Sequence, residues 1–104
     1  MDTNDLSRET YTAIIDTAER FHHDLALQFG VLAGNCKTDN EYLDESESMI
    51  MEWLTEWDLD EVIIDIFYDD PPSKQNFKKT LEKILKNIDK VRKIPIEQRK
   101  FDLW

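Results

Sequence analysis

Residues 73–94 read SKQNFKKTLEKILKNIDKVRKI, and this stretch decides the fold because its helical pattern is unbroken. Its main apolar side chains recur at spacings of 4, 3, 4 and 3 residues, which places them on one stripe of an α-helix: Phe77, Leu81, Ile84, Ile88 and Val91. Lysine and arginine fill most of the other positions. The stretch therefore predicts a long amphipathic helix with one apolar face and one basic face.

The chain ahead of this stretch predicts a first amphipathic helix of about seven turns. Ser7 is a favourable N-cap residue, and the pair Gly34-Asn35 is a typical helix end. The helical stripe is made by Tyr11, Ile14, Ala18, Phe21, Leu25, Phe29 and Leu32. Leu27 and Val31 fall near the opposite face, so another part of the chain is expected to cover them.

A second helix is expected to begin near residues 38–39 and to carry Trp53 and Trp57 one turn apart on its stripe. Its outer face holds acidic side chains and no basic one. Asp58 and the three residues after it have the form of a capping box, which predicts a short third helix. Residues 62–68 are also β-branched and aromatic enough for a strand. No other segment offers a partner strand, so we prefer the helix.

These elements predict an all-α fold with a single domain over residues 1–104. We expect a small helical bundle of three long helices and one short helix, mostly antiparallel because the connections are short. With 40% hydrophobic residues, the chain can form a core without disulfides or a structural metal. The tail at residues 95–104 is expected to dock on the bundle, through Phe101 and through Leu103 or Trp104.

The net charge of −10 is unevenly divided along the chain. Residues 1–70 hold 19 acidic and 3 basic side chains, whereas residues 71–104 hold 4 acidic and 10 basic ones. This acidic excess argues against nucleic acid and anionic membranes as partners, because both attract Lys and Arg. It also indicates that the basic helix offsets the repulsion among the acidic helices. A lone cysteine and the absence of a signal-peptide pattern predict a cytoplasmic protein.

Residues with catalytic or metal-binding potential are few. Glu19 and His22 form an E-x-x-H pair like those of di-iron bundles, but the chain has one such pair and only His23 besides. The plainer interpretation is that Glu19 holds His22 at the edge of the core, or pairs with His23 in solvent. Cys36 beside Lys37 could have a lowered thiol pKa, but no general base is recognisable. We therefore expect no cofactor, no metal and no enzymatic activity.

Aromatic residues among acidic ones are the strongest indication of function. Tryptophans at helical spacing usually pack in a core, whereas an exposed tryptophan ringed by carboxylates is a good anchor for a basic partner surface. The same two interpretations apply to the apolar tail. The candidate partner-binding residues are Trp53, Glu56, Trp57, Phe101, Leu103 and Trp104.

The sequence therefore predicts a small acidic, non-enzymatic interaction module that binds a protein partner as a monomer or homodimer. The alternative is an inhibitor or immunity-type protein, or a nucleic-acid mimic, that binds a basic partner. That comparison with bacteriocin immunity proteins and DNA mimics rests on charge and architecture only. A metal-binding helical-bundle enzyme is the third interpretation.

Overall fold

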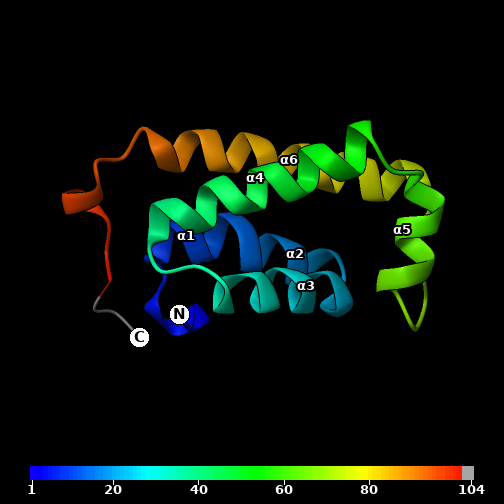
Figure 1. Ribbon diagram of the computed structural model, residues 1–104, viewed down its shortest axis with the longest axis horizontal. Coiled ribbons are helices and arrows are strands. Elements are labelled where there is room, and N and C mark those ends of the chain that lie inside the picture. The colour runs from blue at the N-terminus through cyan, green and yellow to red at the C-terminus, as the bar shows by residue number, and fades with distance from the viewer. Residues whose placement is uncertain (102–104) are drawn as a thin grey trace.

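A computed structural model of the chain describes residues 1–101, and all regular structure in this part is helical (Figure 1). The all-α prediction is therefore confirmed. The elements are a 3₁₀ turn (Thr3–Asp5), α1 (Arg8–Tyr11), a π-helical turn (Thr12–Asp16), α2 (Thr17–Phe21), α3 (His23–Gly34), α4 (Asp39–Thr55), α5 (Leu59–Ile66), α6 (Lys74–Arg92) and a 3₁₀ turn (Ile96–Gln98). None of the helices in residues 1–101 has the length and apolarity needed to cross a membrane.

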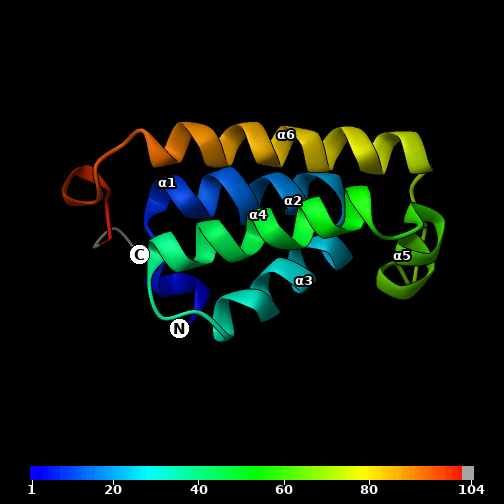
Figure 2. The same ribbon diagram turned by 45° about the horizontal axis from the view of Figure 1, so that its top comes forward.

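The helices form an antiparallel bundle whose two ends differ. Four rods lie side by side, made by α1 with α2, by α3, by α4 and by α6, and successive rods run in opposite directions (Figures 1 and 2). The short helix α5 lies across one end of the bundle. The N-terminus and the tail after α6 lie together at the other end.

The first rod is shorter than the sequence predicts, because the expected seven-turn helix is interrupted at His22. This residue is extended, with φ −164° and ψ 133°, and α3 folds back antiparallel to α2. The Nδ1 atom of His22 accepts the backbone N–H of Asp24 at 3.1 Å, so the imidazole caps the new helix. The break contains neither glycine nor proline, and the apolar spacing continues through it, so the sequence gives no ordinary stop signal there.

The predicted core of α6 is confirmed. Leu81, Ile84 and Ile88 are 0% exposed, and they pack among buried residues from every rod of the bundle. The preference for a helix in the ambiguous stretch is also confirmed, since α5 extends to Ile66. The hydroxyl or carboxylate caps at the starts of α1, α4, α5 and α6 are Ser7, Thr38, Asp58 and Ser73.

A buried ion pair between Asp39 and Arg99 anchors the tail. Their side chains are 1% and 3% exposed, and the Nη1 atom of Arg99 lies 3.0 Å from the Asp39 carboxylate. Arg99 also donates hydrogen bonds to the carbonyl oxygens of Val91 and Ile94, where α6 ends. The N–H and hydroxyl groups of Ser7 and the hydroxyl of Thr10 donate to Asp39. Each member of this network is thus hydrogen-bonded, and it joins the start of α1, the start of α4 and the end of α6.

The expected docking through aromatic tail residues is not seen in residues 95–101. Phe101 is 41% exposed, and Leu27 and Val31, the strip it was expected to cover, are 51% and 68% exposed. Leu103 and Trp104 lie outside the described residues. The tail is held by a guanidinium group because the bundle end offers it a buried carboxylate and the unpaired carbonyls of a helix terminus.

The basic helix α6 meets acidic partners near its ends. Arg92 donates to Asp44 and Glu47 of α4, at 2.7 Å in each case, and Lys74 lies 3.9 Å from Asp60 of α5. Among the described residues, no carboxylate lies within 4.0 Å of the lysines between these pairs or of Lys93. The expected neutralisation therefore operates at the ends of α6 and not along its middle.

Candidate interaction surface at the acidic end

Residues 51–70 form the acidic end of the molecule: the last turns of α4, all of α5 and the start of the loop to α6. This stretch contains eight acidic residues and no basic one, and all eight are exposed: Glu52, Glu56, Asp58, Asp60, Glu61, Asp65, Asp69 and Asp70. Lys74 is the single described cation within 4.0 Å of any of these carboxylates. The acidic end therefore concentrates negative charge on a surface that the protein itself does little to neutralise.

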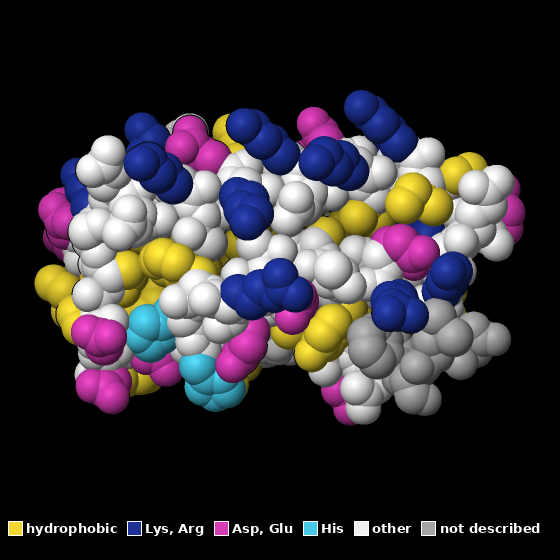
Figure 3. All heavy atoms as spheres, turned by 180° about the vertical axis from the view of Figure 1, so that it is seen from behind, with side chains coloured by type: hydrophobic (Ala, Val, Ile, Leu, Met, Phe, Trp, Pro, Cys, Tyr) yellow, Lys and Arg dark blue, Asp and Glu magenta, His cyan; other side chains and the backbone are white. Residues whose placement is uncertain are grey.

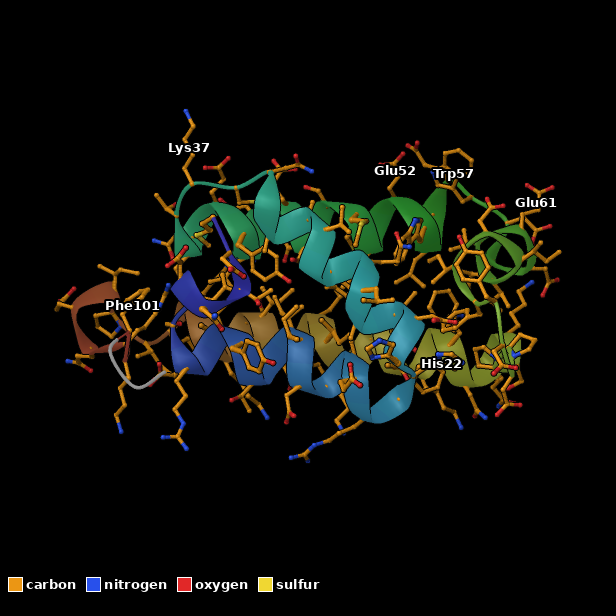
Figure 4. The ribbon with its side chains drawn as sticks, turned by 90° about the horizontal axis from the view of Figure 1, so that it is seen from below. His22, Lys37, Glu52, Trp57, Glu61 and Phe101 are labelled. Atoms are coloured by element: carbon orange, nitrogen blue, oxygen red, sulfur yellow. The ribbon has the colours of Figure 1, made fainter. Side chains whose placement is uncertain are left out.

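Trp57 is exposed at this end because α4 stops two residues before it. The helix ends at Thr55, so Trp57 leaves the stripe that carries Trp53 and is 54% exposed. Its indole Nε1–H donates to the Glu52 carboxylate at 3.0 Å, which fixes the ring beside a negative charge. Figure 4 shows Trp57, Glu52 and Glu61 directed away from the core at the α5 end.

Trp53 is instead partly buried and packs against the core. Its ring lies 6.3 Å from that of Phe29 and 6.1 Å from that of Phe77, measured between centroids. The two tryptophans therefore do not share one stripe as the spacing predicts, because the chain turns between them: the preferred core position holds for Trp53, and Trp57 is exposed. Trp53 still borders a hollow of about 230 Å³ whose other lining residues are Gln28, Trp57, Val62, Asp65 and Ile66.

The loop after α5 presents Tyr68 to solvent. Phe67 is buried, with its ring 5.4 Å from Phe77 and 4.7 Å from His22, whereas Tyr68 is 87% exposed. The backbone N–H of Tyr68 donates to the Asp24 carboxylate at 3.0 Å. Successive residues of an extended segment point to opposite sides, so the burial of Phe67 directs Tyr68 outwards.

His22 holds the same loop. Because Nδ1 accepts the Asp24 N–H, the proton of the neutral ring is on Nε2, which donates to the Asp69 carbonyl oxygen at 2.7 Å. Asp70 follows with φ 52°, a left-handed conformation that aspartate tolerates better than most residues. The break between α2 and α3 and the loop before α6 are therefore fixed by one imidazole.

Three exposed apolar residues of this surface are absent from the sequence-based site: Met51, Ile64 and Tyr68. Ile64 is 75% exposed on the outer side of α5, and Tyr68 is more exposed still. Ile64 could be found from spacing, because Leu59, Val62, Ile63 and Ile66 define the buried stripe of α5 and Ile64 lies opposite to it. Tyr68 follows the helix, and nothing local in the sequence distinguishes its exposure from the burial of Phe67.

The remaining candidate residues lie elsewhere or have structural roles. Phe101 is at the opposite end of the molecule from Trp57 (Figure 4). Of the two predicted partners of Glu19, His22 is wrong and the exposed His23 is confirmed, at 2.9 Å. Within residues 1–101, no group of three or more His, Cys, Asp or Glu side chains is placed to hold a metal ion.

Cys36 does not have the features of a reactive thiol. It is 2% exposed, and its thiol pKa is raised above the usual range by burial and by the nearby carboxylates of Glu41 and Glu45. The alternative of a thiol pKa lowered by Lys37 therefore does not hold, because Lys37 is exposed and the acidic side chains of α4 act in the other direction.

Comparison of the chain with models of protein families, with curated proteins and with solved structures finds no match. The interpretation of the acidic end consequently rests on its own geometry and chemistry.

Proposed function

We propose that the protein is a non-enzymatic interaction module that binds a basic protein surface through its acidic end. The observation that carries this proposal is the exposure of Trp57 and Tyr68, at 54% and 87%, within a stretch of eight exposed carboxylates. Tryptophan and tyrosine are favoured as binding hot spots, because they bury a large area while two torsion angles are fixed. Carboxylates around them favour a partner with Lys and Arg around an apolar recess.

The free protein already holds the side chain of Trp57 and the backbone of Tyr68, which supports the proposal. Glu52 holds the indole of Trp57, and the bonds from His22 and Asp24 hold the backbone next to Tyr68. A side chain that is already ordered loses less conformational entropy when it binds. Eight like charges beside these anchors would also accelerate encounter with a basic partner, and this acceleration would weaken with salt.

A narrower form of the same function is inhibition of an enzyme with a basic active site, such as a nuclease. The density of carboxylates at one end of the molecule favours this form, because such an active site binds phosphates. We place the protein in the cytoplasm, where a lone buried thiol such as Cys36 stays reduced.

The test compares capture of partners by matched variants of the whole chain. The acidic-end variant is Trp57→Ala with Tyr68→Ala and Glu56→Gln; its control is Phe101→Ala with Glu97→Gln, which changes exposed residues near the tail. Each protein is immobilised, and proteins retained from a lysate of the source cells are quantified by mass spectrometry at increasing salt. We expect basic proteins to be retained by the wild type and the control and lost by the acidic-end variant. Equal retention by all three proteins, or loss in the control alone, would refute the proposal.

A further inference from the structure

A second surface lies near the tail end of the molecule, away from the acidic end. It is a groove of about 450 Å³ between the α1 rod and the C-terminal half of α6, and Lys100 closes one side of it. Figure 3 shows the face of the molecule on which Lys and Arg side chains gather along α6 and beside the tail. The volume lies within the range of sites for small molecules.

Three cationic side chains line the groove: Arg8, Lys90 and Lys100. All three residues are exposed, and among the described residues no carboxylate lies within 4.0 Å of their charged groups. Glu9 also lines the groove, but one of its carboxylate oxygens accepts the backbone N–H of Lys100 at 2.9 Å. In a protein with a net charge of −10, three cations that line one groove without described acidic partners favour an external anion.

The backbone around the groove is held in place. The N–H of Arg8 donates to the carbonyl oxygen of Lys100 at 2.7 Å, and Glu9 accepts the N–H of Lys100, so the start of the α1 rod is tied to the tail residue that closes the groove. Behind Lys100, the buried Arg99 secures the tail to the bundle. The cations are thus carried on fixed elements, although their side chains reach into solvent.

The floor of the groove combines polar and apolar groups around the π-helical turn. Asn87 of α6 donates to the carbonyl oxygen of Ala13 at 3.1 Å and to the hydroxyl of Thr17 at 3.3 Å, which fills the wide turn. The Thr12 hydroxyl has no hydrogen bond within the described residues and can donate to a ligand. Ala13 and Val91 supply apolar surface beside it. Turns of this kind are frequent at functional sites.

We propose that this groove binds a small organic anion, a carboxylate or a phosphate monoester, whose hydrocarbon part lies over Ala13 and Val91. Arg8, Lys90 and Lys100 would surround the anionic group, and the Thr12 hydroxyl would donate to it. The acidic remainder of the molecule repels long polyanions, which favours a compact ligand. A carboxylate can come from a free molecule or from residues 102–104 of this chain, which follow Phe101 and include Asp102. The experiment separates these sources.

The test is an NMR titration of the whole protein with phenyl phosphate, with phenol as the neutral probe that keeps the same aromatic ring. We expect phenyl phosphate to shift the side-chain amide signals of Asn87 and the backbone amide signals of Thr12 and Ala13 saturably at millimolar concentration. Phenol should shift them weakly. The matched variants are Lys90→Gln and Lys86→Gln, which remove one exposed lysine each from the same helix, inside and outside the groove.

Lys90→Gln should weaken binding about two- to fivefold, the size expected for one exposed charge pair, and Lys86→Gln should leave it unchanged. Equal weakening by both variants would overturn the proposal, because it would show diffuse attraction to α6. A protein lacking residues 102–104 is titrated in parallel. Stronger binding after this deletion supports the site and identifies the chain's own last residues as its resident anion. Absence of saturable shifts in both the full chain and the shortened protein would overturn the proposal.

Discussion

The two ends of the bundle use charge in opposite ways. At the tail end, Asp39 and Arg99 are buried, paired and fully hydrogen-bonded, and they join segments 60 residues apart in the sequence. At the acidic end, eight carboxylates are exposed and Lys74 is their one described cationic neighbour within 4.0 Å. The charges of the tail end hold the chain together, whereas those of the acidic end are available to another molecule.

This difference predicts where substitutions change stability and where they change binding. A buried pair is costly to break, because the remaining charge lacks water. Exposed carboxylates that repel one another contribute little to stability and can oppose it. Substitutions in the buried pair of the tail end should therefore have larger effects on stability than substitutions at the acidic end.

The largest effect is expected from the buried pair. Asp39→Ala and Arg99→Ala should each lower the free energy of unfolding by about 3–5 kcal/mol, because each leaves an uncompensated charge in the core. Urea denaturation followed by circular dichroism measures the change. The control is Asp44→Ala, which removes an exposed partner of Arg92 and should cost about 0–1 kcal/mol. If Arg99→Ala cost no more than the control, the network would not anchor the tail.

The second effect concerns His22, which links the break after α2 to the loop that carries Tyr68. His22→Ala should lower the free energy of unfolding by about 1–3 kcal/mol, because an N-cap and a second hydrogen bond are lost together. His22→Asn keeps a capping group but is too short to reach Asp69, so it should cost about half as much. Amide hydrogen exchange of Tyr68 should accelerate in both variants. Equal stability of the alanine and asparagine variants would show that only the contact with Asp69 matters.

The parts of the fold that could be predicted from the sequence are those with local causes. The stripe of α6 and the caps at Ser7 and Asp58 depend on residues within one or two turns, and the structure confirms them. The break at His22 depends on the Asp69 carbonyl, 47 residues away. The burial of Arg99 likewise depends on Asp39, and a single arginine in a polar tail gives no local sign of it.

The acidic end shows the same division between local and distant causes. Its charge and the candidate residue Trp57 could be predicted, because composition and residue type alone indicate them. The exposure of Tyr68 could not, since it follows from the burial of Phe67 against α6 and against the break in the first rod. The exposure of a side chain that a turn directs outwards can be predicted only when the packing of its neighbours is known.

Cys36 can serve as a reporter of the tail end, because it lies between α3 and α4. Its backbone carbonyl oxygen accepts a hydrogen bond from the Met1 amino group at 2.7 Å. Its thiol pKa is raised in the folded protein, so the folded state resists ionisation. At pH values below the thiol's pKa in the unfolded state, the free energy of unfolding should therefore not depend on this thiol. It should decline as pH rises from that pKa through the thiol's higher pKa in the folded state. Cys36→Ala should make the alkaline decline in the free energy of unfolding shallower, and the part due to Tyr42, whose pKa is also raised by burial, should remain.

The same thiol can be followed by alkylation at mildly alkaline pH. Cys36 should react much more slowly in the native protein than in urea, and Arg99→Ala should accelerate the native reaction by opening this end. Asp44→Ala serves again as the control and should leave the rate unchanged. A native rate equal to the rate in urea would contradict the burial of this residue.

The smallest effect distinguishes two carboxylates of the acidic end. Glu56 is the C-cap residue of α4, where a negative charge opposes the helix dipole, whereas Glu61 is in the first turn of α5, where it is favoured. Replacing either by glutamine relieves the same mutual repulsion. Glu56→Gln should therefore raise the free energy of unfolding by about 0.3–1 kcal/mol, and Glu61→Gln should leave it unchanged or lower it by a similar amount. Both changes should shrink in about 1 M salt, where charges are screened within about 3 Å.

If Glu56→Gln stabilises the protein and also weakens retention of its basic partners, this carboxylate serves binding at the expense of stability. If it stabilises the protein and leaves retention intact, the basic partner does not contact this part of the acidic end.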